Sequence, residues 1–449
     1  MVSETVSSSE PDPQGGRPRV FVIGCGFGGL SAAKALRKAP VDVVLLDRNN
    51  YYLFQPLLYQ VASAALNPSE IAGPIRSIFR NQRNAVVVLG EVTSVDLEAK
   101  QLIVKGEKAS FDYLILAAGA TDNYFGNDHW KGFAPGLKTL DSALNIRARI
   151  LLSFEAAEVE ADEESRSAKL TFVIIGGGPT GVEMAGAVKE LAVDIIARDF
   201  KIANLSSTRV VLIEAGDRIL PAMHPDCSAR AKRDLEQMGV EVMLGKPVAD
   251  ISERGVQVGE TFIRSGNVIW AAGIRANPLT RTLGIELGPG GRVPVEPDLS
   301  IKGYPYAFAV GDICAAKDAA TGKPVPGLAR PAIQMGRYVA KIITAESSGL
   351  PSPRRLPFRY ADKGVMATVG RTRAVAQIRN LCFGGAMAWF LWLFVHILFL
   401  IGFRNRVVTM LSWIENYVFF RYGSRLIIGR RDYTLVRPVS RRPPEDTLR

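Results

Sequence analysis

The sequence has few of the residues that build metal centres or redox-active disulfides. Its 449 residues include only four cysteines and three histidines. No pair of cysteines has CxxC or metal-ligand spacing, and no histidine lies near another ligand in the sequence. We therefore expect reduced thiols and no metal site. The cysteines are Cys25, Cys227, Cys314 and Cys382.

The sequence also lacks a recognisable signal peptide and a series of long apolar spans. Residues 1–17 are rich in Ser, Glu, Pro and Gly and have neither the basic nor the apolar region of a signal peptide, which predicts a disordered tail on a cytoplasmic protein. The lack of several long apolar spans argues against proton pumping across a membrane. The length, with 47% hydrophobic and 22% charged residues, is typical of a globular protein with two or three domains.

The net charge of +11 is concentrated at one end of the chain. Residues 371–449 contain 13 arginines, no lysine and four acidic residues, and so carry +9 of the +11. The remainder is nearly neutral, which argues against a nucleic-acid partner.

The same basic end contains an apolar run, residues 386–403, followed by an amphipathic segment. As one helix the run would be about 27 Å long, marginally short of a membrane span, with Trp389 and Trp392 at headgroup level. The next segment places one apolar stripe along a helix, formed by Val407, Leu411, Ile414 and Val418. We predict contact with an anionic lipid surface. The alternatives are helices packed into the protein body or a homodimer interface.

A glycine-rich turn follows the first apolar strand in "VFVIGCGFGGLSAAKAL", residues 20–36. Gly24, Gly26 and Gly29 have the spacing of a dinucleotide-binding turn, in which missing side chains let the backbone approach a pyrophosphate at a helix N-terminus. Asp47 ends the following strand, 18 residues after Gly29, where a carboxylate accepts hydrogen bonds from ribose hydroxyls.

A second unit repeats this pattern in "TFVIIGGGPTGVEMAGA", residues 171–187, with Gly176, Gly178 and Gly181. Its strand-ending acid is Glu214, 33 residues after Gly181, so a longer connection must intervene. A carboxylate there disfavours a 2′-phosphate and favours NADH over NADPH, although Arg218 lies nearby. Two nucleotides in one chain suggest electron transfer between them.

Three further strands end in small or acidic residues that suit a nucleotide site. "YLILAAGA" (113–120) and "VIWAAGIRANP" (268–278) bring Gly119 and Gly273, where small residues permit close chain crossing. "YAFAVGDICA" (306–315) brings Gly311 and Asp312 to a position where a carboxylate can meet a sugar or ribitol hydroxyl.

The order of these motifs resembles the flavoproteins with two dinucleotide-binding domains, over about residues 18–345. The resemblance implies an α/β fold with two Rossmann-like domains and a C-terminal membrane-associated helical region. The first turn, Asp47 and Asp312 would hold FAD, and the second turn and Glu214 would hold NADH. The implied divisions are a tail (1–17), an FAD domain (18–140 and 285–350) split around an NADH domain (141–284), and a C-terminal quinone-site and membrane region (351–449).

Three more motifs resemble type II NADH dehydrogenases, which are single-chain NADH:quinone oxidoreductases that do not pump protons. They are "NNYYLFQPLLYQVA" (49–62), "ARPAIQMGRYVA" (329–340) and "DKGVMATVGR" (362–371). By this resemblance Glu183 lies near the flavin and nicotinamide, and Gln334 and Lys363 serve the quinone. Arg330 replaces the first glutamine of the family's AQxAxQ motif, so that residue's role does not transfer.

The implied chemistry is hydride transfer from NADH to FAD and then reduction of a membrane quinone by an enzyme bound peripherally to the cytoplasmic side of the cell membrane. Two rivals share the nucleotide-binding frame. A soluble disulfide, sulfide or ferredoxin reductase is one, although disulfide and sulfide chemistry needs positioned cysteines, for which Cys314 is the one candidate. A redox-switched flavoprotein that binds a partner is the other.

Overall fold

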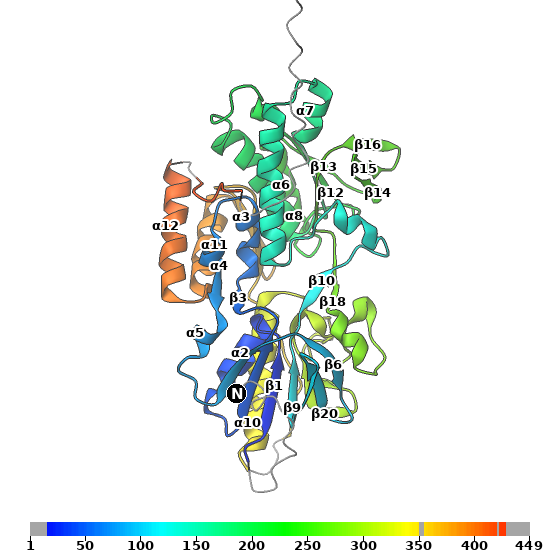
Figure 1. The fold of residues 1–449 in the computed structure, drawn as a ribbon, viewed down its shortest axis with the longest axis vertical. Coiled ribbons are helices and arrows are strands. Elements are labelled where there is room, and N and C mark those ends of the chain that lie inside the picture. The colour runs from blue at the N-terminus through cyan, green and yellow to red at the C-terminus, as the bar shows by residue number, and fades with distance from the viewer. Residues whose placement is uncertain (1–15, 350–353, 420–421, 428–449) are drawn as a thin grey trace, which may run out of the picture.

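A computed structural model describes residues 16–349, 354–419 and 422–427 (Figure 1). The predicted tail, apart from residues 16 and 17, lies outside these ranges, as do most arginines of the basic end. The described chain forms two nucleotide-binding units, one above the other in Figure 1, with the C-terminal region along one side.

The first unit is a six-stranded sheet built from two separate parts of the chain. Its order is β19-β20-β9-β1-β2-β5, and the pairs from β20 to β5 are parallel. These strands are Ser300–Ile301, Tyr304–Ala309, Tyr113–Leu116, Arg19–Ile23, Asp42–Asp47 and Ala85–Leu89. Because β19 and β20 follow the whole second unit in sequence, the predicted split of this domain is confirmed.

The second unit is a four-stranded parallel sheet in the order β13-β12-β11-β17. Its strands are Val240–Met243, Arg209–Ile213, Thr171–Ile175 and Asn267–Trp270, and every residue of β11 is buried. Helices α6 (Leu140–Glu158), α8 (Pro179–Glu190) and α9 (Pro225–Gln237) belong to this unit. The fold class is therefore confirmed as α/β with two Rossmann-like units.

The chain crosses between the units twice, and the two crossings pair with each other. Strand β10 (Ala120–Asp122) runs antiparallel to β18 (Ile274–Ala276). Two antiparallel three-stranded sheets extend the units: β6-β7-β8 within Val92–Ser110, and β14-β15-β16 within Val248–Arg264. Shorter pieces near the junction are β3 (Tyr51–Leu53), α3 (Leu58–Ala62), α4 (Pro68–Ile71), β4 (Ala72–Pro74) and α5 (Ile75–Phe79).

Two helices of the first unit approach each other closely. Helix α2 (Phe27–Ala35) packs along α10 (Ala329–Ser347), and a Cβ on Gly336 of α10 would lie 2.2 Å from the carbonyl oxygen of Gly28. Only glycine allows this contact. The second turn of α10 is thereby held against the start of α2.

The C-terminal region bridges both units. It consists of an antiparallel sheet, β21 (Val365–Thr368), β22 (Ala374–Ile378) and β23 (Leu381–Gly384), followed by α11 (Ala386–Phe399) and α12 (Phe403–Phe419). The sheet packs on α8 and α9 of the second unit, whereas α12 packs on α4 of the first. No helix in the described ranges is long and apolar enough to cross a membrane.

Three expectations for this end of the chain are wrong. The run 386–403 is not one helix, because it breaks at Leu400–Gly402, where Gly402 has a φ of +84°. The tryptophans do not face outward: Trp389 is 8% and Trp392 0% exposed, and both pack against the protein. The four cysteines are not all free thiols, since Cys227 of α9 and Cys382 of β23 form a disulfide across 155 residues.

Candidate active site

The first glycine turn combines two sterically required glycines with one that faces open space. Gly24 has a φ of +95°, and a Cβ there would lie 2.5 Å from the carbonyl oxygen of Ala117. A Cβ on Gly29 would lie 1.8 Å from the carbonyl oxygen of Gly24. Gly26, the N-cap of α2, would meet nothing within 4 Å. The protein therefore needs the outer two glycines for its own packing, and the middle one leaves room for a ligand.

The second turn repeats this arrangement at the N-terminus of α8. Gly176 has a φ of +109°, and its Cβ would lie 2.5 Å from the carbonyl oxygen of Ala271. A Cβ on Gly181 would lie 1.8 Å from the carbonyl oxygen of Gly176, whereas Gly178, the N-cap of α8, faces open space. Both turns thus offer an uncovered helix N-terminus, with its partial positive charge and unpaired N–H groups, which suits a dinucleotide pyrophosphate.

Each turn is tied to the acid of its own unit by the same type of hydrogen bond. Asp47 Oδ2 accepts from the Cys25 N–H at 2.6 Å, and Glu214 Oε2 accepts from the Gly177 N–H at 2.6 Å. Burial raises the pKa of Asp47, although the N–H groups of Cys25 and Asn49 oppose this shift. These carboxylates keep unused lone pairs at the end of their strands, where ribose hydroxyls are expected to lie.

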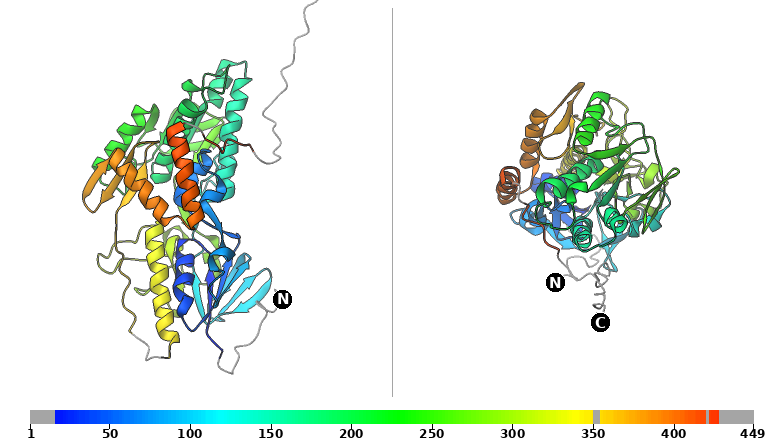
Figure 2. Two further views of the ribbon diagram at one scale, coloured as in Figure 1. Left: turned by 90° about the vertical axis from the view of Figure 1, so that its left-hand side faces the viewer. Right: turned by 90° about the horizontal axis from the view of Figure 1, so that it is seen from above.

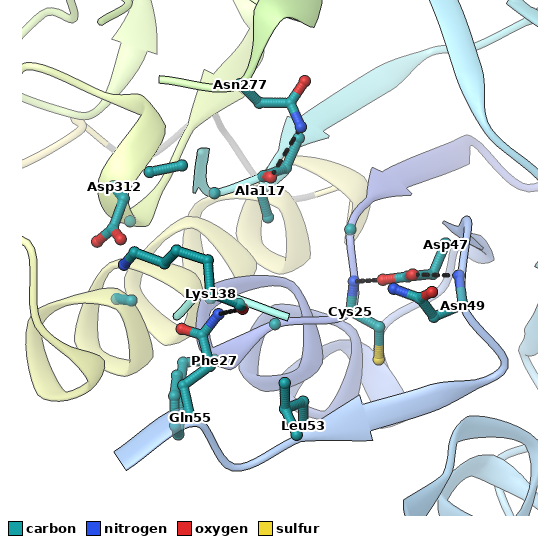
Figure 3. Close-up of a pocket in the computed structure, with 18 of the residues that line it drawn as sticks. Cys25, Phe27, Asp47, Asn49, Leu53, Gln55, Ala117, Lys138, Asn277 and Asp312 are labelled. Atoms are coloured by element: carbon teal, nitrogen blue, oxygen red, sulfur yellow. Dashed lines mark hydrogen bonds between the residues drawn. The ribbon is translucent and has the colours of Figure 1, made fainter. Parts of the chain in front are cut away.

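One cleft joins the first turn to parts of both units (Figure 3). It is lined by four predicted site residues besides the turn: Asp47, Gly119, Gly311 and Asp312. Thr180, in the first turn of α8, lines it too, so the second unit's helix begins at the first unit's cleft. The residues present fit an extended dinucleotide in this cleft.

Sequence reasoning missed several residues of this cleft, among them Lys138, Thr180 and Asn277. Gln55 Nε2 donates to the Lys138 carbonyl oxygen at 3.2 Å, and Asn277 Nδ2 donates to the Ala118 carbonyl oxygen at 3.4 Å (Figure 3). Thr180 and Asn277 occur within the quoted motifs, but Lys138 lies in a connection that carries no motif. Gly273 does not line the cleft; a Cβ there would lie 2.8 Å from the ring of Phe125.

Glu183 lies one helical turn beyond Thr180 and lines a separate small cavity of about 30 Å³. The Thr368 N–H donates to its carboxyl at 3.4 Å, and burial raises the pKa of Glu183 to about 8. Glu190, two turns further along α8, lines the same cavity and pairs with Arg371 at 3.2 Å. Burial also raises the pKa of Glu190 to about 8.

A chain of hydrogen bonds connects this cavity to the C-terminal helix. Trp413 Nε1 donates to Gln60 Oε1 at 2.8 Å, and Gln60 Nε2 donates to Tyr59 Oη at 3.0 Å. Tyr59 Oη lies 2.9 Å from Thr368 Oγ1, and the backbone N–H of Thr368 contacts Glu183. Helix α12 therefore helps to close the cavity around Glu183.

Gln334 binds the segment just before Lys363, and neither residue lines that cavity. Gln334 Nε2 donates to the Ala361 carbonyl oxygen at 3.0 Å, and its Oε1 accepts from the Ala361 N–H at 2.9 Å. Lys363 is exposed and precedes β21, whose far end is Thr368. Arg330, at the departure from the family motif, stacks its guanidinium 5.2 Å from the ring centre of Phe399.

The remaining thiols are poorly suited to nucleophilic chemistry. Cys314 is buried, and burial raises its pKa to about 12. Burial likewise raises the pKa of Cys25. Because the thiolate is the reactive form, this disfavours disulfide chemistry at Cys314.

The two turns and the shared cleft suit a protein that binds two dinucleotides. Residues 18–336 match the pyridine nucleotide-disulphide oxidoreductase family, and residues 363–422 match the NDH2 C-terminal domain. The chain is 45% identical to type II NADH:quinone oxidoreductase NdhA of Mycobacterium tuberculosis, over 91% of this chain and 89% of the relative. Identity to the Ndh protein of the same organism is 44%, over 94% and 92%. The chain therefore belongs to the type II NADH:quinone oxidoreductases.

Solved structures agree at the level of the fold. NDH2 from Plasmodium falciparum, in complex with NADH, has a TM-score of 0.83 at 20% identity, covering 92% of this chain and 100% of that one. The sulfide:quinone oxidoreductase of Aquifex aeolicus has a TM-score of 0.68 at 18% identity, covering 87% and 92%.

Gly178→Ala should keep the fold and bound FAD but weaken NADH binding. A Cβ at Gly178 meets no protein atom and its φ of −70° suits alanine, so the methyl group would occupy only the ligand's space. We expect KM for NADH to rise at least tenfold with an unchanged melting temperature. Gly132→Ala, which also meets open space, is the matched control. Unaltered KM in Gly178→Ala would place the pyrophosphate elsewhere.

Glu183→Gln should flatten the pH dependence of stability. The folded protein holds the Glu183 proton up to about pH 8, whereas an unfolded carboxyl loses it near pH 4.5. The folded state therefore binds more protons in this window, and stability falls as pH rises through it. Melting temperatures at pH 5, 6.5 and 8 should decline less in Glu183→Gln than in the wild type, whereas the exposed-site control Glu155→Gln should follow the wild type. If the melting temperatures of all three proteins declined in parallel, Glu183 would not be a buried carboxyl that stays neutral in this pH range.

Proposed function

We propose that the predicted site residues, apart from Gly273, serve the successive stages of NADH:quinone oxidoreduction. The first turn would hold FAD, which would supply the hydride acceptor for NADH and the electron donor for a quinone. The observation that carries this proposal is the single cleft lined both by the first glycine turn and by Thr180 of the second unit. Two helix N-termini with bare N-caps begin beside it, so two dinucleotides can approach each other there.

The chain's own residues bind and orient the two dinucleotides. Gly24, Gly26 and Gly29 form the first pyrophosphate cradle, with Asp47 at the ribose and Asp312 at the ribitol. Gly176, Gly178 and Gly181 form the second cradle. Glu214 favours NADH, since its carboxylate would repel a 2′-phosphate. Lys138 also lines the cleft of the first turn, and its ammonium group favours an anionic ligand such as a dinucleotide there.

Proton handling and quinone contact are assigned to the three remaining candidates. Glu183 is a carboxyl kept neutral near pH 7 within one helical turn of the cleft, and so can hold a proton for the reaction. Gln334 and Lys363 would meet the quinone. In this structure the Gln334 amide binds the backbone of Ala361, so contact with a quinone requires exchange of those two hydrogen bonds.

We assign the lipid contact to an outer face formed by α11 and α12. Helix α12 turns its polar side chains toward the protein: Asn405, Thr409 and Asn416 donate to the carbonyl oxygens of Ala72, Glu70 and Ala65. Its exposed side is mostly apolar, with the charged residues Arg404 and Glu415 also exposed. This outer face consists of Met387, Phe390, Phe394, Leu398 and Phe399 of α11 and Phe403, Met410, Leu411, Ile414 and Val418 of α12. A helix with this reversed polarity suits an apolar environment.

The outer face is proposed to meet the cytoplasmic side of the cell membrane, where a lipid-soluble quinone is available. Flanking arginines favour anionic lipid at that surface. A homodimer that buries the outer face is the alternative occupant. Neither arrangement requires a membrane span.

Rapid mixing without oxygen separates the two half-reactions. NADH should bleach the flavin of the wild type, and a quinone should restore its colour within one turnover. Gln334→Ala and Lys363→Ala should slow restoration at least tenfold and leave bleaching unchanged. If bleaching slowed as much as restoration, the quinone assignment would be wrong. Slow restoration in the wild type would favour the redox-switched flavoprotein.

Replacing apolar residues of the outer face should release the enzyme from lipid without unfolding it. Leu411 and Ile414 are 56% and 49% exposed, so Leu411→Gln with Ile414→Gln removes little protein packing. We expect at least a tenfold loss of binding to vesicles, since each buried Leu or Ile contributes roughly 1.5–3 kcal/mol. Ile202→Gln, at a 67% exposed site on the second unit, is the control. Unchanged vesicle binding with a lost dimer would assign the face to a second copy.

A further inference from the structure

A groove distinct from the dinucleotide cleft runs along the packed helices α2 and α10. Its volume is about 930 Å³, within the range of roughly 300–1,000 Å³ found for ligand pockets. Apolar side chains from α2, α10 and the corner between α11 and α12 line most of it. They include Leu30, Ile333, Leu398, Phe399 and Ile401.

The rim of this groove is strongly basic. Lys34, Arg337, Lys341 and Arg406 line it, and no acidic residue does. Lys34, Arg337 and Lys341 are exposed, and none of them belongs to an ion pair within the described residues. Four cations around an apolar floor, without a compensating carboxylate, favour an anionic ligand with a long apolar part.

The groove is continuous with the outer face. Leu398 and Phe399 belong to both, and the left view of Figure 2 presents α12 in red above yellow α10 and blue α2, all on the side facing the viewer. The groove and the outer face therefore share an apolar edge formed by Leu398 and Phe399.

We propose that the groove binds one anionic phospholipid, with its phosphate among Lys34, Arg337, Lys341 and Arg406 and an acyl chain along α2 and α10. The proposal rests on the assignment of the outer face to lipid. A quinone would suit the apolar floor, but it is neutral and gains little from four cations. The charge of the rim therefore favours the phospholipid.

The bound lipid can be measured on the full-length enzyme isolated in a mild detergent. Mass spectrometry of extracted lipid should find about one anionic phospholipid per flavin in the wild type. The variant Lys34→Gln with Lys341→Gln should lose it. The variant Lys105→Gln with Lys108→Gln, which makes the same change in net charge on the exposed β7–β8 hairpin, should keep it.

Titration of the delipidated enzyme then gives the specificity. Phosphatidylglycerol should bind at least tenfold more tightly than phosphatidylcholine. In Lys34→Gln with Lys341→Gln its affinity should fall about 30-fold, because each cation near an anionic headgroup contributes a factor of roughly five. Equal affinity for the two lipids, equal retention by all three proteins, or a quinone in place of the phospholipid would overturn the proposal.

Vesicle binding by the same proteins separates this site from the outer face. The Lys34→Gln, Lys341→Gln variant should still sediment with vesicles, because the outer face is intact, while lacking its tightly held lipid. A wild type that retains the phospholipid in detergent but does not bind vesicles would contradict the outer-face assignment alone. A wild type that binds vesicles but retains no phospholipid would contradict the groove alone.

Discussion

Each nucleotide-binding unit depends on one close contact, between the third glycine of its turn and the carbonyl oxygen of the first. A methyl group at Gly29 or Gly181 would lie 1.8 Å from that oxygen, so the helix can approach the strand only when no side chain is present. This contact fixes the position at which α2 and α8 begin. It also leaves the middle glycine uncovered, so that the helix N-terminus is open to an anionic ligand.

The position of α8 links the two units chemically. Its first turn reaches the cleft of the first unit through Thr180, and the next turn carries Glu183 into a cavity closed by Tyr59, Thr368 and α12. Burial at that cavity raises the pKa of Glu183 to about 8, and this is why its carboxyl keeps its proton near neutral pH. A helix that begins at the nucleotide site thus ends against the region assigned to lipid and quinone.

Much of this arrangement follows from the sequence because it depends on local patterns. The glycine spacings, the strand-ending acids and the apolar stripe of α12 each record a backbone or periodicity requirement. The orientation of α11 was not predictable in the same way, since a run that is apolar on every side does not reveal which face packs inward. In the structure Trp389 and Trp392 face the protein, whereas Phe390 and Phe394 are exposed. Nothing in the run itself distinguishes these two pairs.

Other features depend on contacts between distant segments, for which one sequence offers no signal. Three such features are the disulfide between Cys227 and Cys382, the position of Lys138 in the cleft, and the hydrogen bonds between Gln334 and the Ala361 backbone. The family resemblance supplied the roles of Glu183, Gln334 and Lys363, and the geometry adds a separate cavity for Glu183.

The most direct test of a shared cleft is the absorption spectrum of the chemically reduced enzyme during titration with NAD⁺ in the absence of oxygen. If both dinucleotides meet in the cleft that joins the first turn to Thr180, saturating NAD⁺ should produce a broad long-wavelength charge-transfer band, since such a band requires contact between the reduced flavin and the nicotinamide. Saturable NAD⁺ binding without that band would contradict a shared cleft.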